Sequence, residues 1–474
     1  MRQYENQVQK IKHEVLSMVA KSAMEHSLLE DIQKMPRIIN PGPEGLVRCC
    51  VHHERAVTSE RIDMLLGGNK IKEQIIEVLP SACDQCLENR FIVTETCRGC
   101  LAHRCVGACP VSAISVHNGK ALIDQKKCIE CGKCKDACPY SAIADVMRPC
   151  RRGCPTDAIV MDDNKRAIID YDACISCGSC VYNCPFGAIQ DKSEILDVID
   201  ILEKNTNVYA ILAPAFATQF QYVPLENVIS GIKKLGFRDV VEVALGADLI
   251  IKHEVEEFLE RETPAMTSSC CPGFVNLIEL KYPELMSSVS NTVSPMIATA
   301  RLIHSIDPGS KIVFIGPCIA KKHEKLRYTE IEYVLTFEEL DALLDASEID
   351  LEKIEPSPLN NASYYGRKFA ASGGVANAVV NYHKSISDEP LEVVKCDGIK
   401  ACDKALKQLK YNRIKDAFIE GMACEGGCIK GPVTMHHGPK DVKAVDAYAK
   451  QAFENEINTS IEVFNKITLD LRRR

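Results

Sequence analysis

The feature of this sequence that most constrains its fold is a cysteine pattern that recurs along one stretch of the chain. The element C-P-x-x-A-I occurs four times, at Cys109, Cys138, Cys154 and Cys184. Two copies close a complete C-x2-C-x2-C-x3-C-P run, and the cysteines of these runs are Cys128, Cys131, Cys134 and Cys138, and Cys174, Cys177, Cys180 and Cys184. Closely spaced thiolates without interleaved histidines favour 4Fe-4S clusters over zinc. Residues 81–190 are therefore expected to form bacterial-type ferredoxin modules.

Disulfide bonds are the alternative use for so many cysteines. The chain has 25 cysteines in 474 residues. Disulfide-stapled scaffolds are usually short secreted domains, whereas this chain begins MRQYENQVQKIKHEV, which is charged and helical and is no secretion signal. In a reducing compartment, C-x-x-C runs indicate metal ligation. We expect iron–sulfur ligation in a cytoplasmic protein.

A third run is complete apart from a two-residue expansion, and it pairs with the first complete run. Its cysteines are Cys97, Cys100, Cys105 and Cys109. In two-cluster ferredoxins of this type, the last cysteine of each run binds the other cluster. The predicted ligand sets of one self-sufficient module, residues 97–143, are Cys97, Cys100 and Cys105 with Cys138, and Cys128, Cys131 and Cys134 with Cys109.

The fourth run is split, which suggests an insertion. Cys150-x3-Cys154 lacks its first C-x-x-C, and Cys83-x2-Cys86 stands unassigned upstream. One module, about residues 95–145, would then be inserted within another. The resulting sets are Cys174, Cys177 and Cys180 with Cys154, and Cys83, Cys86 and Cys150 with Cys184. Sixteen cysteines fill four clusters, and only Cys49–Cys50 is left in this half. With His52 and His53 that pair could bind metal, but a simple thiol pair is favoured because adjacent cysteines rarely chelate one ion together.

The remainder of the chain predicts two further regions. Residues 1–80 show helical periodicity, broken by turn residues at 40–43. Residues 191–474 alternate helices with the apolar strands NVYAILAP, RDVVEVA, KIVFIGP and DAFIEGM. The expected fold is an α/β catalytic domain, preceded by α+β ferredoxin-like domains and a helical N-terminal segment. Ligands should gather at the carboxyl ends of the parallel strands.

Composition excludes two classes of partner. The formal charge of -8 leaves no basic surface for nucleic acid, and no stretch approaches the apolar length of about 20 residues that spans a bilayer. We therefore expect neither a nucleic-acid nor a membrane partner.

Five cysteines in the second half lie in three distinctive strings. They are Cys270 and Cys271 in TSSCCPGF, Cys318 in GPCIAKKHE, and Cys424 and Cys428 in EGMACEGGCIKGP. These strings resemble, in order and cysteine position, the signature motifs of the iron-only (FeFe) hydrogenases, and the resemblance extends from Asn207 to the C-terminus. It implies a 4Fe-4S cluster on Cys271, Cys318, Cys424 and Cys428, joined to a diiron centre with CO, CN and dithiolate amine ligands. The implied activity is reversible interconversion of dihydrogen with protons and electrons.

The resemblance also implies roles for individual residues. Cys270 would relay protons to the bridgehead amine, and Glu254, Glu257, Ser290 and Arg261 would carry them outward. Lys321 would bind a cyanide ligand, with Glu324 positioning it. The residues implied to line the diiron pocket are Pro214, Ser294, Met422, Gly373 and Gly374. Without the motifs, Glu254, Glu257 and Arg261 would be interpreted as a solvated helix face, and Cys270 as a structural thiol.

Four departures from the family pattern suggest a divergent subgroup. Gly316 stands where methionine is usual, Phe274 replaces a tryptophan, Ala215 replaces a serine, and the stretch after Cys428 is shortened to residues 430–432. Such changes around the active cluster should alter its potential and favoured direction, so the turnover of familiar enzymes is not carried over. Cys396 and Cys402, expected to flank a loop, are interpreted as structural thiols.

Two other classes share this scaffold: a hydrogenase-like assembly protein of cytosolic iron–sulfur biogenesis, and a hydrogen sensor with slow turnover. Retention of Cys270, Lys321, Met422 and the acidic relay argues against the assembly protein. For the enzyme, the expected partners are dihydrogen and protons, ferredoxin or a similar low-potential carrier, and hydrogenase maturation proteins, in anaerobic hydrogen metabolism.

Overall fold

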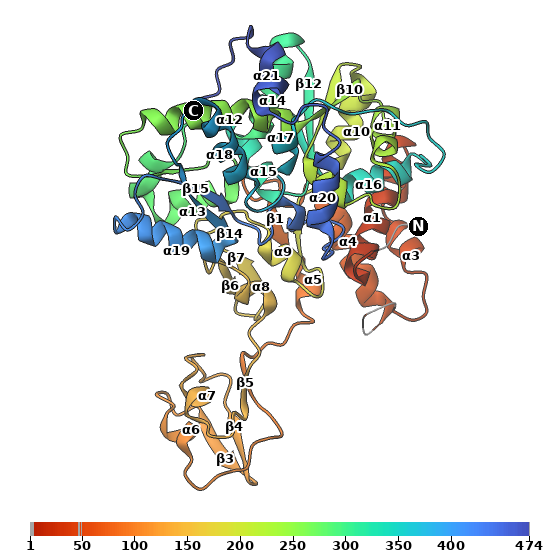
Figure 1. The fold of residues 1–474 in the computed structure, drawn as a ribbon. Coiled ribbons are helices and arrows are strands. Elements are labelled where there is room, and N and C mark those ends of the chain that lie inside the picture. The colour runs from red at the N-terminus through yellow and green to blue at the C-terminus, as the bar shows by residue number, and fades with distance from the viewer. Residues whose placement is uncertain (1–3, 46–47, 49, 474) are drawn as a thin grey trace.

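The computed structural model describes residues 4–45, 48 and 50–473, and it consists of a large body from which one small module projects (Figure 1). Cys49 lies outside the described residues, and Cys50 is exposed at the start of a helix. In the described part of the chain, no helix is both long and apolar enough to cross a membrane.

The N-terminal segment is helical only as far as residue 65. Its helices are α1 (Gln7–Met24), α2 (Leu28–Asp31), α3 (Met35–Ile39) and α4 (Val51–Leu65). The prediction that helix continues to residue 80 is wrong, because β1 (Ile76–Val78) pairs antiparallel with β8 (Ile189–Asp191). The apolar spacing of this stretch fits either structure, and pairing with a strand far along the chain decides between them. Helix α1 packs on α16 (Phe337–Ala346) and buries Val15, Leu16 and Val19 in the main core.

A ferredoxin-like unit lies within the body. Besides the β1–β8 pair, its elements are α5 (Pro80–Cys83), α8 (Pro149–Arg152), α9 (Ser179–Asn183) and the antiparallel pair β6 (Ile159–Met161) and β7 (Ala167–Ile169). A second unit interrupts it between α5 and α8. This inserted module contains β2 (Phe91–Val93), α6 (Arg104–Gly107), β3 (Ile114–His117), β4 (Lys120–Ile123), α7 (Lys133–Ala137) and β5 (Ile143–Asp145). Strands β2 and β5 pair where the chain enters and leaves the module, which projects from the body below α8 (Figure 1).

The rest of the chain is an α/β domain with two parallel sheets. One has the order β10-β9-β12-β13, from strands Asp239–Glu242, Val208–Leu212, Lys311–Gly316 and Tyr333–Thr336. The other has the order β11-β15-β14, from strands Met266–Thr267, Ala417–Met422 and Glu392–Asp397. The α/β fold is confirmed, and the four apolar strings predicted as strands are β9, β10, β12 and β15.

Helices surround these sheets. The α-helices are α10 (Ile195–Lys204), α11 (Leu225–Lys234), α12 (Val243–Glu260), α13 (Pro272–Lys281), α14 (Pro295–Ile306), α15 (Ile319–Glu324), α16, α17 (Tyr364–Lys368), α18 (Gly374–Ile386), α19 (Ile399–Lys410), α20 (Asp441–Ala449) and α21 (Ile457–Ile461). Short 3-10 helices are η1 (Pro214–Thr218), η2 (Pro283–Ser288), η3 (Lys325–Arg327), η4 (Cys428–Lys430) and η5 (Glu462–Phe464). The prediction that Cys396 and Cys402 flank a loop is wrong, because Cys396 lies in β14 and Cys402 in α19.

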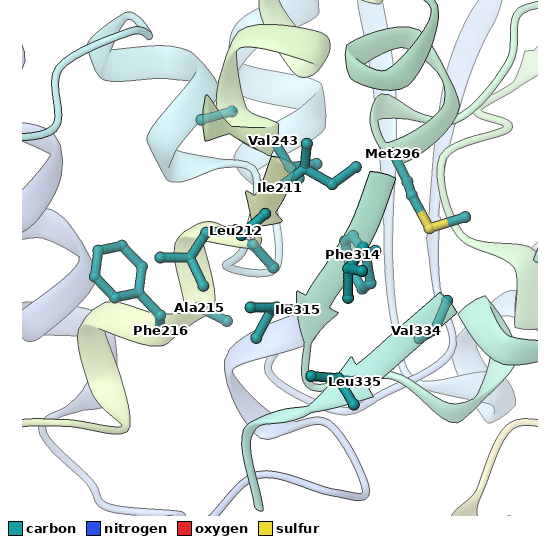
Figure 2. Close-up of a cluster of buried hydrophobic side chains, with 14 of the residues drawn as sticks. Ile211, Leu212, Ala215, Phe216, Val243, Met296, Phe314, Ile315, Val334 and Leu335 are labelled. Atoms are coloured by element: carbon teal, nitrogen blue, oxygen red, sulfur yellow. The ribbon is translucent and has the colours of Figure 1, made fainter. Parts of the chain in front are cut away.

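The four-stranded sheet holds the centre of the core. Ile211, Phe314 and Val334 lie on adjacent strands, and Met296 of α14 packs nearby (Figure 2). Parallel strands covered on both faces read as continuous apolar runs, which is why these segments were recognisable in the sequence.

Candidate active site

Four partly buried cysteines meet at the carboxyl ends of strands from both sheets. Cys271 follows β11, Cys318 follows β12, Cys424 follows β15, and Cys428 begins η4. Burial and then repulsion from Cys271 raise the pKa of the Cys318 thiol to about 11. Burial raises that of Cys424 well above its usual range, with Cys318, Cys271 and Cys428 contributing in turn. The four thiols therefore share one electrostatic environment.

The backbone at Gly427 lies close to that of residues 370–372, and this positions Cys428 beside the other three cysteines. Gly427 has φ +88°, and a Cβ there would lie 2.6 Å from the Ser372 nitrogen and 2.8 Å from the Ala370 oxygen. Only glycine fits this turn without displacing the backbone. Four thiols with no imidazole or carboxylate among them suit a 4Fe-4S cluster. Among the described residues, no group of three side chains is arranged to hold a single metal ion.

Two further groups lie beside the four cysteines. Cys270 is buried, and its pKa is raised well above the usual range by burial and then by Glu254. The Lys321 ammonium donates to a Glu324 carboxylate oxygen at 2.7 Å and to the Cys270 carbonyl oxygen at 3.4 Å. Burial alone would lower the pKa of Lys321, but Glu324, together with Cys318 and Cys270, outweighs burial and the pKa is raised. Lys321 is therefore a fixed, buried cation that faces the cysteine group.

The residues predicted to line the diiron pocket lie at the ends of strands and the starts of helices. Pro214 and Met422 are buried at the ends of β9 and β15, and Ser294 precedes α14. The Ser294 hydroxyl has no hydrogen-bond partner among the described residues, so it is available to a bound group. Gly373, with φ +83°, and Gly374 begin α18.

Glu420 was not singled out in the sequence. Its carboxylate accepts hydrogen bonds from the Gly373 and Ala376 amides, at 2.8 Å and 2.9 Å, and burial raises its pKa. The available signal was one acidic residue within the apolar strand AFIEGM. The contacts indicate that Glu420 holds the glycine turn in place.

An acidic path leads from Cys270 toward the surface. Glu254 is fully buried, and one carboxylate oxygen accepts from the Ser269 amide at 3.3 Å while the other has no partner among the described residues. Burial, followed by repulsion from Glu257, raises the pKa of Glu254 to about 8. The Ser290 hydroxyl donates to Glu257 at 2.7 Å. Glu254 is therefore protonated at neutral pH and can exchange a proton.

The path ends in an open cleft of about 610 Å³ lined by Glu257 and Arg261. Arg261 stacks on Phe258 at 3.6 Å and donates to Asp416 at 3.2 Å. Arg261 also donates to the Phe258 carbonyl oxygen, and in the described part of the chain it makes no hydrogen bond to Glu257. Arg261 therefore lines the mouth of the path.

The ferredoxin cysteines fall into four groups. Two cavities in the inserted module are each lined by four cysteines: Cys97, Cys100, Cys105 and Cys138 in one, and Cys109, Cys128, Cys131 and Cys134 in the other. In the body unit, Cys150 neighbours Cys83, Cys86 and Cys184, whereas Cys180 neighbours Cys154, Cys174 and Cys177.

The last group adjoins the active-site loops. Cys177 is an electrostatic neighbour of Cys424. A Cβ on Gly178 would lie 2.6 Å from Pro432 and 2.8 Å from Ile319.

Gly316 and Phe274, two of the residues that depart from the family pattern, both lie in tightly packed positions beside a strand end. A Cβ on Gly316 would meet the Phe314 ring at 2.5 Å, and one on Gly421 would meet the Phe274 ring at 2.1 Å. These rings therefore occupy the space beside both strand ends.

Comparison with known families identifies both halves of the chain. Residues 206–432 match the family model "Iron only hydrogenase large subunit, C-terminal domain". Residues 90–139 match a 4Fe-4S dicluster domain, and residues 167–190 match a 4Fe-4S binding domain.

Individual relatives agree with these matches. Iron hydrogenase 1 of Clostridium pasteurianum is 30% identical over 68% of this chain and 66% of its own length. The periplasmic [Fe] hydrogenase large subunit of Nitratidesulfovibrio vulgaris is 31% identical over 65% of this chain and 85% of its own. A probable cytosolic Fe-S cluster assembly factor of Aedes aegypti is 25% identical over 44% of this chain and 55% of its own. A variant of the [FeFe]-hydrogenase HydA1 of Chlamydomonas reinhardtii shares the fold, with a TM-score of 0.50 and 18% identity over 58% of this chain and 94% of its own.

Proposed function

This chain belongs to the iron-only hydrogenase family, and from that premise we propose that it interconverts dihydrogen with protons and electrons. The residues that would hold the active cluster are Cys271, Cys318, Cys424 and Cys428. When bound, a 4Fe-4S cluster joined to a diiron centre with CO, CN and dithiolate amine ligands supplies the metal chemistry that splits dihydrogen, which no side chain can supply.

Lys321, Ser294 and the apolar wall orient and shield this group. The buried ammonium of Lys321, kept charged by Glu324 at 2.7 Å, suits an anionic cyanide ligand. Ser294 offers an otherwise unpartnered hydroxyl. Pro214, Met422 and the turn at Gly373 and Gly374 limit the entry of water, with Glu420 fixing that turn.

The observation that carries the proposal is the line of proton-exchanging groups from buried Cys270 to an open cleft. Cys270 passes a proton to Glu254, whose pKa of about 8 suits exchange near neutral pH. Ser290 donates to Glu257 and influences the pKa of the neighbouring Glu254, so it can hand a proton from Glu254 to Glu257, which lines the cleft beside Arg261. An assembly factor has no need of such a path.

Electrons take a separate route through four accessory 4Fe-4S clusters, held by the four cysteine sets described above. The last of these sets adjoins Cys424, which gives electrons a way in or out. The partner is ferredoxin or a similar low-potential carrier, hydrogenase maturation proteins supply the diiron group, and the enzyme works in the cytoplasm.

The similarity to cytosolic assembly factors makes iron–sulfur assembly the second candidate. Hydrogen evolution from a chemically reduced low-potential donor separates the two. The matured protein should evolve hydrogen, and Cys270→Ala should abolish evolution while retaining iron. Equal residual rates in both proteins would favour assembly or slow sensing and contradict catalysis through Cys270. Cys402→Ala, which removes another buried thiol, is the matched control.

A further inference from the structure

One accessory cysteine set is distinguished by a buried cationic hydrogen-bond donor. Arg148 Nη1 donates to Cys83 Sγ at 3.2 Å, and Arg148 Nε donates to the Leu87 carbonyl oxygen at 3.2 Å. The side chain is only 7% exposed, so water screens its charge weakly. Arg148 is also an electrostatic neighbour of Cys86 in the same set. Arg148 therefore acts on two of the four sulfurs in this set.

A second buried arginine lies near the same set. Arg61 is 2% exposed, and its Nη2 donates to the Gly187 carbonyl oxygen at 3.0 Å, three residues after Cys184. Its Nε and Nη1 atoms have no partner among the described residues. Burial, followed by Arg48, lowers the pKa of Arg61 to about 10, and Cys184 opposes that shift. Arg61 thus remains charged at neutral pH beside the Cys184 ligand.

The other accessory sets lack such a donor among the described residues. Their sulfurs accept hydrogen bonds from backbone amides: Cys97 from Ala121, Cys109 from Ala113, Cys138 from Ala142, Cys154 from Ala158 and Cys174 from Ser176. Cys154 also contacts the Thr156 hydroxyl. Amide donors are common to all such clusters, whereas a guanidinium adds a full positive charge.

The cysteine set next to Arg148 lies between the inserted module and the set that adjoins the active site. Glu130, between Cys128 and Cys131 of the inserted module, pairs with Arg151 of α8 at 2.9 Å, and Arg151 is next to Cys150. Cys150 is in turn an electrostatic neighbour of Cys180 in the set that adjoins the active site. The set of Cys83, Cys86, Cys150 and Cys184 therefore lies at the junction between the projecting module and the body (Figure 1).

We propose that Arg148 and Arg61 make this junction cluster the accessory cluster with the highest reduction potential, so that it is reduced first and stores an electron between the module and the active site. Reduction adds negative charge to a cluster, and a nearby cation and hydrogen-bond donor stabilise the reduced form. The inference rests on the proposed function only in requiring that the cysteine set binds a 4Fe-4S cluster.

The test is a redox titration of the full-length, cluster-loaded protein, followed by electron paramagnetic resonance. Arg148→Met should lower the reduced-to-oxidised ratio of the highest-potential cluster at least about tenfold at a fixed potential, which is about 59 mV for one electron. Arg148→Lys should retain part of the difference, and Arg61→Met should produce a smaller shift in the same direction. Arg152→Met is the matched control, because Arg152 ends the helix whose N-cap is Arg148 but is exposed, and its hydrogen bonds to described residues all go to backbone carbonyls.

The outcomes separate this inference from the proposed function. An unchanged highest-potential signal in Arg148→Met, or an equal shift in Arg152→Met, would overturn the inference. Should Arg148→Met lose a cluster, as iron and spin counts would reveal, Arg61→Met decides, and an unshifted potential there overturns the inference. The titration needs no hydrogen turnover, so an inactive protein with these potentials contradicts only the enzymatic proposal. Absence of accessory-cluster signals in the wild-type protein would contradict both.

Discussion

Replacing Glu254 by glutamine should make the protein more stable and much less active. The buried carboxyl has a pKa of about 8, against 4.5 for an ordinary glutamate. At about 1.4 kcal/mol per pH unit, ionising it costs about 5 kcal/mol more in the folded chain than in the unfolded chain. Between pH 4.5 and 8 the unfolded chain binds fewer protons at this position, so the wild type loses stability as the pH rises through this window.

Glutamine has no such ionisation, and this determines the expected pH profile. The stability of Glu254→Gln relative to wild type should therefore rise from pH 4.5 to pH 8 and then level off, by at most about 5 kcal/mol. Because glutamine cannot relay a proton, hydrogen evolution should fall by at least about 100-fold. Thermal unfolding at a series of pH values and hydrogen evolution at neutral pH measure the two effects.

The control is Glu256→Gln, since Glu256 lies on the same helix but is exposed. It makes the same chemical change at an exposed position on the rim of the cleft, off the line from Cys270 through Glu254 and Ser290 to Glu257, and it should alter neither the pH profile nor the rate. Identical pH profiles for the two variants would refute the burial argument, and an unimpaired rate in Glu254→Gln would refute its place in proton transfer.

Three other substitutions test separate parts of the account. Ser290→Ala removes the hydroxyl that donates to Glu257 at 2.7 Å, and it should slow hydrogen evolution at least about tenfold without loss of iron, since a relay group contributes that much or more; an unchanged rate would exclude Ser290 from the path. Lys322→Met removes the cation that lies 2.8 Å from buried Asp191 and 3.0 Å from buried Glu339, which leaves Asp191 with Lys12 and Glu339 without this partner, and it should destabilise the fold by about 3–5 kcal/mol in unfolding experiments. The exposed Lys204→Met should have little effect, and equal stability of the two variants would contradict the importance of the buried pair. Cys424→Ala should lose the iron of one 4Fe-4S cluster on elemental analysis, whereas Cys396→Ala should lose none; the reverse pattern would contradict the ligand assignment.

The sequence predicted the α/β fold and its central strands well because both depend on local patterns. Apolar runs such as KIVFIGP are recognisable wherever a strand is covered on both faces. The spacing of cysteine runs likewise indicated which thiols could share a cluster, including the split set around Cys83 and Cys150. Covalent spacing and short-range periodicity carry this information directly.

The features that escaped prediction depend on contacts between distant segments. The strand at 76–78 exists because it pairs with residues 189–191. Lys12 of α1 and Lys322 of α15 meet at Asp191, which ties the N-terminal helix to the ferredoxin unit and the catalytic domain. Arg148 likewise reads as an ordinary charged residue until the fold places it against Cys83. No periodicity in the sequence signals such meetings.

The infrared spectrum of the matured protein tests the central claim most directly. Iron-bound carbon monoxide and cyanide have stretching bands at higher frequency than the carbonyl groups of the peptide, where no protein group absorbs, so the presence of these bands reports the diiron group itself. The account predicts these bands in the wild-type protein and in Cys270→Ala, and their loss or displacement in Lys321→Met. A fully iron-loaded and matured protein without such bands would contradict the proposed active site and leave a multi-cluster electron carrier.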